Sequence, residues 1–194
     1  MNIDREMGLA AQLQKRGDLG GALAIYQKIL KVEPTLSVAH YNLALIHKAH
    51  QKFGAAEKSF KSALKADPRY LLARRAFTRF LADRGKFKEA LRLAIKTCDL
   101  NRSTPESLQE LADLLQAANS TDLGSLASEA LLRCLGRRDV DCDGVILAAL
   151  HILKSHPALK PLLKSGQTTD QLSDYIYREL PNINQALNEP VIAQ

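Results

Sequence analysis

The sequence has no tryptophan, few aromatic residues of any kind and only three cysteines. The cysteines, Cys98, Cys134 and Cys142, do not stand at the spacing of a zinc site, and three thiols cannot all pair with one another. These absences argue against a disulfide-stabilised scaffold and against a structural zinc site. The interpretation that remains is that the thiols are buried or incidental and that the protein works in a reducing compartment.

Long apolar runs are also missing. No segment approaches the roughly 18 uninterrupted apolar residues that a membrane-spanning helix requires. Met1–Leu13 carries Asp4, Arg5 and Glu6 where a secretory signal peptide would need an apolar run. The sequence therefore predicts a soluble, cytoplasmic protein with no membrane partner.

The residues that are present favour helix. Alanine, leucine and lysine are abundant, runs of β-branched residues are rare, and 46% of the 194 residues are hydrophobic. That content is enough to build a core for one or two domains. The expected fold class is therefore all-α.

Charge is distributed unevenly along the chain, whose overall net charge is +6. Residues 1–97 hold 19 Lys and Arg against 8 Asp and Glu, a net charge of +11. Residues 98–194 hold 8 against 13, a net charge of −5. All but two of the aromatic residues also fall in the first half. We infer two segments with different functions.

A period of 34 residues organises the first half of the chain. The stretch Ser37–Tyr70 contains two apolar-periodic runs, a short break and a proline stop, and such a fixed period is typical of stacked-repeat architectures. Two antiparallel helices need a small residue where their backbones come closest, a bulky residue beside it, and a proline where the second helix ends. The residues that align at this period are Ala22, Ala56 and Ala90, then Tyr26 and Phe60, then Pro34 and Pro68.

At these positions the chain resembles the tetratricopeptide-repeat (TPR) family, although the family's tryptophan is missing. The second unit carries the family's pattern at Leu43, Ala44, Ala56, Phe60, Ala63 and Pro68. The first unit, about 3–36, carries Leu9, Ala10, Gly17, Ala22, Tyr26 and Pro34. The third, about 71–104, carries Gly85 and Ala90, with Ala94 in place of the aromatic residue and Arg102 in place of the proline. The resemblance implies a right-handed superhelical stack of antiparallel helix pairs, a TPR solenoid.

The repeats and the breaks between them divide the chain into three parts. Residues 1–104 are expected to form three TPR-like helical hairpins, residues 105–135 a degenerate fourth repeat or capping hairpin, and residues 136–194 a small helical C-terminal subdomain. Ser103 or Thr104 is expected to cap the first helix of the degenerate unit. The predicted helices of the first two parts run over 3–16, 19–32, 36–50, 53–66, 69–84, 87–99, 105–118 and 123–135.

Beyond residue 136 the period is lost. Val145–Leu153 is apolar nearly all round, which predicts a buried helix in this subdomain. The last residues, from Pro190 onward, resemble the first turn of a further helix. We therefore expect the natural polypeptide to continue past Gln194.

One short motif has the pattern of a metal site. Asp139, Asp141 and Asp143, followed by Gly144, match the opening of a calcium-binding loop. The twelfth position of such a loop should be a bidentate glutamate, and Leu150 stands there instead. We favour the interpretation that one of the aspartates caps the following helix, whose N-terminal end attracts carboxylates. The sequence leaves open whether the three aspartates bind any ion.

Motifs of enzyme chemistry are absent from the sequence. It has no Gly-rich phosphate loop, no nucleophile elbow and no recognisable Cys–His signature. His40, His47 and His50 are close together, but their spacings do not form a compact set with acids or cysteines, so we interpret them as structural. We predict no enzymatic activity, no bound metal and no cofactor.

The predicted binding site is a groove. Stacked helical hairpins form a concave surface lined by their first helices, and repeat proteins bind partners there. Arginines four residues apart can grip carboxylates, an asparagine can hold a peptide backbone, and apolar residues fill the space between. The predicted function is a protein-interaction module whose partner is an extended, acidic segment of another protein. The groove residues are Tyr41, Asn42, Leu45, Lys48, Leu72, Arg75 and Arg79.

Two other functions are compatible with the sequence. The basic first half suits a nucleic-acid-binding helical repeat, but its cations are not interleaved with exposed aromatic residues, which disfavours nucleic acid. The chain is also faintly similar to the substrate-recruiting or regulatory N-terminal region of a larger enzyme, such as a bacterial methyltransferase. Lys58, Lys61 and Lys65 are interpreted as part of a solvated helix face. The sequence fixes neither the identity of the partner nor the oligomeric state.

Overall fold

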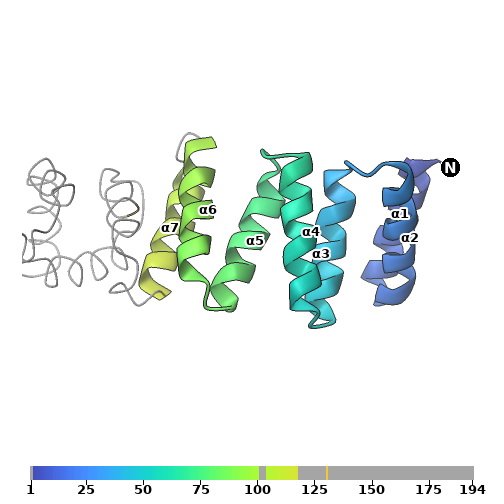
Figure 1. The fold of residues 1–194 in the computed structure, drawn as a ribbon, viewed down its shortest axis with the longest axis horizontal. Coiled ribbons are helices and arrows are strands. Elements are labelled where there is room, and N and C mark those ends of the chain that lie inside the picture. The colour runs from blue at the N-terminus through green and yellow to red at the C-terminus, as the bar shows by residue number, and fades with distance from the viewer. Residues whose placement is uncertain (1, 101–103, 118–129, 131–194) are drawn as a thin grey trace, which may run out of the picture. The chain divides into compact units, whose positions relative to one another are not determined.

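The computed structural model describes residues 2–100, 104–117 and 130, and the regular elements in these ranges are all α helices (Figure 1). The all-α class predicted from the composition is confirmed. The chain divides into two compact units, Met1–Phe77 and Thr78–Gln194. The helices are α1 (Ile3–Lys15), α2 (Leu19–Val32), α3 (Ser37–Ala49), α4 (Phe53–Ala66), α5 (Leu71–Asp83), α6 (Phe87–Leu100) and α7 (Pro105–Ala117).

These helices begin and end close to the predicted residues. The largest shift is at α5, which begins at Leu71 rather than at residue 69. The residues before Leu71 are held in a turn by Asp67, because its carboxylate accepts a hydrogen bond from the Arg69 backbone N–H at 2.8 Å. Its carbonyl accepts another from the Tyr70 backbone N–H at 3.2 Å. Aspartate side chains that bond nearby backbone groups in this way favour a turn over a helix.

The turn between the two helices of each hairpin has the same geometry three times. Gly17, Gln51 and Gly85, which are 34 residues apart, have φ angles of 84°, 57° and 71° in the left-handed region. After each of them, the next backbone N–H donates to the carbonyl five residues earlier at 2.9 Å. Glycine adopts this conformation freely, whereas a Cβ atom strains it. The turn between α3 and α4 therefore has a backbone conformation that Gln51 adopts only with strain.

In the first unit, α1 packs against α2, α3 against α4, and α2 against α3. Ala22 and Ala56, the small residues predicted at the closest approach of each hairpin, are completely buried. The bulky residues predicted beside them, Tyr26 and Phe60, are completely buried as well. Phe60 also stacks on Phe77 with ring centroids 5.3 Å apart, which joins α4 to α5. The burial pattern agrees with the 34-residue register.

Leu9 differs from the residues with which the sequence aligns it. Leu43 and Phe77 are each 6% exposed, whereas Leu9 is 46% exposed. Leu43 packs into a core with Ala22 and Ile29 of the preceding hairpin. Helix α1 is the first described helix. No preceding helix in the described part of the chain therefore covers the face of Leu9 that is equivalent to the buried face of Leu43.

In the second unit, α6 packs against α7. Ala90 and Ala94 of α6 are both buried. Cys98 is a buried free thiol whose Sγ donates to the Ser107 carbonyl oxygen at 3.3 Å, which ties α6 to α7. The expectation of a buried thiol is thus confirmed for Cys98. Helix α7 begins directly after Thr104, whose carbonyl accepts a hydrogen bond from Ser107 Oγ at 2.8 Å.

Much of the predicted C-terminal organisation lies outside the described residues. This applies to the second helix of the degenerate unit, to the segment 136–194, to the motif at Asp139, Asp141 and Asp143, and to the continuation past Gln194. The three-part division at 1–104, 105–135 and 136–194 stays a prediction. Where the structure describes the chain, no helix has both the length and the apolar character needed to cross a membrane.

Candidate peptide-binding groove

All but one of the predicted groove residues belong to the first unit. Tyr41, Asn42, Leu45 and Lys48 lie on α3, and Leu72 and Arg75 lie on α5. Arg79 is also on α5, but it belongs to the second unit. Arg79 lies on α5 one turn after Arg75, and its side chain is exposed.

Tyr41 connects α3 with the start of α5. Its ring lies edge-on to the ring of Tyr70 with 5.4 Å between the centroids, and it lies 6.5 Å from the ring of Phe60. Edge-to-face pairs at such separations are favourable. Burial, and to a lesser extent Tyr41 and Asp67, raises the pKa of Tyr70, so its phenol stays neutral. The aromatic pair brings the two groove-lining elements of this unit together.

Asn42 and Leu45 follow Tyr41 along α3, and both are half-buried. The Asn42 side chain makes no hydrogen bond within the described residues. A half-exposed amide that the fold does not use can offer two donors and one acceptor to a ligand. Leu45 adds apolar surface beside it.

Two of the three cations of the predicted groove, Lys48 and Arg75, are already engaged within the protein. Arg75 is exposed and Lys48 is half-buried, and each takes part in an interaction with another residue of the chain. A ligand carboxylate would therefore have to displace the existing partners of these side chains.

Arg74 differs from its neighbour Arg75, because it is buried and its Nη1 donates to the Pro68 carbonyl at 3.1 Å. Burial lowers the pKa of Arg74, which is a structural residue.

Sequence reasoning missed one residue of this surface. Val38 stands 34 residues before Leu72, at the same repeat position, and the two side chains are 37% and 58% exposed. Single exposed apolar side chains are common on protein surfaces, so the shared repeat position rather than the exposure groups these two residues. The period that placed Leu72 in the groove would have placed Val38 there too.

The two histidines of α3, His40 and His47, and the neighbouring His50 have different surroundings. His40 Nε2 lies 2.8 Å from the Pro34 carbonyl oxygen, and His50 follows the last residue of the helix. The Nδ1 atom of His47 is buried and has no hydrogen-bond partner among the residues that the structure describes. Burial, followed by the charges of Lys52 and His50, lowers the pKa of His47. Among the described residues, no group of three His, Cys, Asp or Glu side chains could hold a metal ion.

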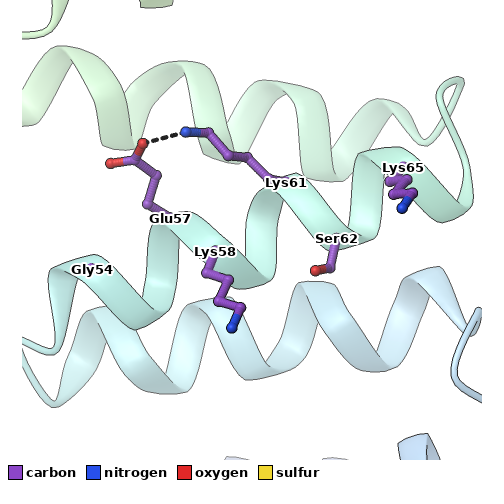
Figure 2. A pocket seen from close by; sticks show the side chains of 6 residues that line it. All are labelled: Gly54, Glu57, Lys58, Lys61, Ser62 and Lys65. Carbon is purple, nitrogen blue, oxygen red and sulfur yellow. Dashed lines mark hydrogen bonds and ion pairs between the residues drawn. The ribbon is translucent and has the colours of Figure 1, made fainter.

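A hollow of about 390 Å³ lies along one stripe of α4 (Figure 2). We call it the α4 hollow. It contains the lysines that the sequence assigned to a solvated helix face, and the Nζ of Lys61 lies 2.6 Å from Oε1 of Glu57. None of the predicted groove residues lines it. The lining residues are Gly54, Glu57, Lys58, Lys61, Ser62 and Lys65.

Comparison with known proteins gives a likeness in structure alone. No family model matches the sequence, and no curated protein matches it. The solved structure of MamA (RS-1, the ArsTM double mutant) is similar with a TM-score of 0.57 and 11% identity, over 97% of this chain and 97% of that one. YrrB, described as a TPR protein with an unusual peptide-binding site, is similar with a TM-score of 0.55 and 19% identity, over 88% of this chain and 84% of that one.

PilF of Pseudomonas aeruginosa is a third similar structure, with a TM-score of 0.53 and 16% identity, over 97% of this chain and 77% of that one. At such identities the likeness establishes the fold and nothing more. The repeat period, the paired helices and these structural relatives agree with one another. The chain therefore has the fold of the tetratricopeptide-repeat proteins.

Proposed function

We propose that the protein is an interaction module that binds an extended, acidic segment of a partner protein along the first helices of its repeats. The observation that carries the proposal is the surface made by α3 and the start of α5. There the half-exposed Tyr41 and Asn42 lie on an element joined through Tyr70 to the exposed Leu72 and Arg75. Repeat proteins of this fold bind partners through their first helices.

Each part of this surface has a chemical role in the proposal. Asn42 would hydrogen-bond the backbone of the segment, and Leu45 and Leu72 would contact apolar side chains. Arg75 and Arg79, four residues apart on one helix, would bind carboxylates through their planar guanidinium groups. Such contacts steer association and weaken with salt, so the expected affinity is modest and the complex transient.

The likeness to YrrB supports a peptide rather than a folded domain as the ligand, since that protein is described by its peptide-binding site. An extended peptide alternates its side chains between two faces. A segment whose every second residue is in turn acidic and apolar would therefore present both carboxylates and apolar side chains on the one face that meets the protein.

The test is a fluorescence-anisotropy titration with a labelled peptide whose every second residue is in turn glutamate and leucine, with serine at the positions between them. We expect binding to the unmodified protein, and at least about tenfold weaker binding to the Arg75→Glu/Arg79→Glu variant, because reversed charges repel the peptide. A second peptide with glutamine in place of glutamate should also bind more weakly. Circular dichroism of the variant should match that of the parent.

The matched control is Lys15→Glu/Lys31→Glu on α1 and α2, which makes the same change in net charge away from the groove residues. This control should bind the glutamate peptide as the parent does. Equal loss in both variants would mean that the peptide responds to net charge alone, and equal affinity in all three proteins would place binding elsewhere. Either result contradicts the proposed groove.

A further inference from the structure

The α4 hollow is separate from the groove residues, which belong to α3 and α5. Its lining residues recur along α4 at spacings of three and four, which return to the same face of a helix. The hollow is therefore one continuous surface along α4 rather than a chance gap between distant segments. Three of its six lining residues are lysines, and one is an acid.

The positive charge of the hollow is only partly neutralised. Lys61 forms an ion pair with Glu57 one turn earlier. Lys58 and Lys65 are exposed, and neither makes an ion pair or a hydrogen bond within the described part of the chain. In Figure 2 the Glu57–Lys61 pair and the Lys58 side chain extend to opposite sides of α4. Lys58 and Lys65 are thus the two cations available to a ligand.

Folding alone does not account for this stripe. Lys61 and Lys65 are like charges four residues apart, which destabilises a helix. Gly54 is the second residue of α4, and a Cβ atom there would meet nothing within 4 Å, so packing does not require glycine. Both features make sense if another chain approaches α4 at this place, since glycine permits close approach and the lysines attract anions.

We propose that the α4 hollow binds an acidic segment of a partner protein, with Lys58 and Lys65 each contacting one carboxylate. The two lysines are two helical turns apart, which is about 10 Å along the axis. Carboxylates at i and i+7 of a helix lie on one face of it and have the same separation. This second site extends beyond the proposed groove and does not depend on it.

The chemistry of the stripe selects a protein over the other anionic partners. Single-stranded nucleic acid is bound through aromatic side chains on which bases stack, and the hollow has none. A membrane surface would need apolar side chains on the stripe to enter the lipid, and these are missing too. The carboxylate of Glu57 further disfavours a continuous polyanion.

The experiment is a titration of the ¹⁵N-labelled full chain, followed by backbone amide shifts. The probe is a blocked helical peptide with glutamates at i and i+7. The control peptide has the same sequence with glutamines in place of these glutamates. We expect the glutamate peptide to shift amides of α4 and the glutamine peptide to leave them in place. The Lys58→Gln/Lys65→Gln variant should bind the glutamate peptide about two- to thirtyfold more weakly.

The matched control is Lys28→Gln/Lys31→Gln, which removes the same charge from α2 and should bind as the parent does. Unchanged affinity of the α4 variant, or shifts confined to α3 and α5, would overturn the proposal. So would shifts of the α4 amides by a single-stranded RNA or by phosphatidylserine vesicles but not by the glutamate peptide. If the peptide designed for the α3–α5 groove does not bind, this test is unaffected, because it monitors the backbone amides of α4.

Discussion

At the scale of single residues, the repeat lets one position be compared with its equivalents in the same chain. Gln51 occupies the left-handed turn position that Gly17 and Gly85 occupy in the neighbouring units. A non-glycine residue in this conformation is strained by the contact between its Cβ atom and the following carbonyl. Gln51 is exposed, so its side chain provides no packing that offsets the strain.

Replacing Gln51 with glycine should therefore stabilise the protein by about 1 kcal/mol, or raise the melting temperature by about 2–4 °C. The measurement is thermal unfolding followed by circular dichroism. The converse variant, Gly85→Gln, should be destabilised by a similar amount, since a Cβ there would meet open space and only the backbone strain would change. If Gln51→Gly melts below the parent, the turn is not strained.

His47 is a second residue that departs from its equivalents, which are Leu13 and Leu81. Its Nδ1 atom is buried without a partner in the described part of the chain, and burial lowers its pKa below the ordinary value of 6.5. The folded protein therefore binds fewer protons at His47 than the unfolded chain does. The stability is fully present above about pH 6.5 and falls as the pH drops below it, because unfolding then takes up a proton.

The His47→Leu variant should lose this part of the pH dependence. We expect its melting temperature to fall less than that of the parent between about pH 7.5 and pH 5.5. At the higher pH the variant should be more stable on the order of 1 kcal/mol, because an unsatisfied buried nitrogen has been removed. Parallel melting curves for the two proteins over this range would show that His47 does not titrate as inferred.

At the scale of elements, the α3–α4 hairpin depends on a small residue at its closest approach. Ala56 is completely buried, with Phe60 one turn later on α4. Ala56→Leu should overpack the hairpin and destabilise the protein by about 1–3 kcal/mol, measured by urea unfolding. Gly54→Ala, on the open stripe of the same helix, should instead stabilise it by up to about 1 kcal/mol. An Ala56→Leu variant as stable as the parent would contradict the register.

At the scale of the whole molecule, the excess of positive charge in residues 1–97 raises the question of nucleic acid. The aromatic side chains among the described residues are buried or half-buried, because they pack within the repeats. Without stacking platforms, binding would rest on charge alone and would be lost as salt rises. We expect no retention of single-stranded RNA in a filter-binding assay at about 150 mM salt. Tight binding at that ionic strength would favour the nucleic-acid interpretation over the peptide one.

The sequence by itself determined the period, the helices and their order. These are local matters: alanine at 22 and 56 permits close approach, glycine at 17 and 85 ends a helix, and proline at 34 cannot continue one. The candidate groove followed from the same period, since repeat position fixes which face of a helix a residue occupies. Val38 was as predictable as Leu72 and was missed only because the period was not applied to it.

The tertiary structure alone decided which side chains are used by the fold. Arg74 and Arg75 are adjacent and chemically identical, yet one is buried on the Pro68 carbonyl and the other is exposed. Leu9 has the repeat position of Leu43 but lacks a described helix against it. The α4 hollow likewise appears only when lysines spaced along the sequence are placed on one stripe. Burial and ion pairing depend on distances between segments, and those distances are set by packing rather than by local sequence.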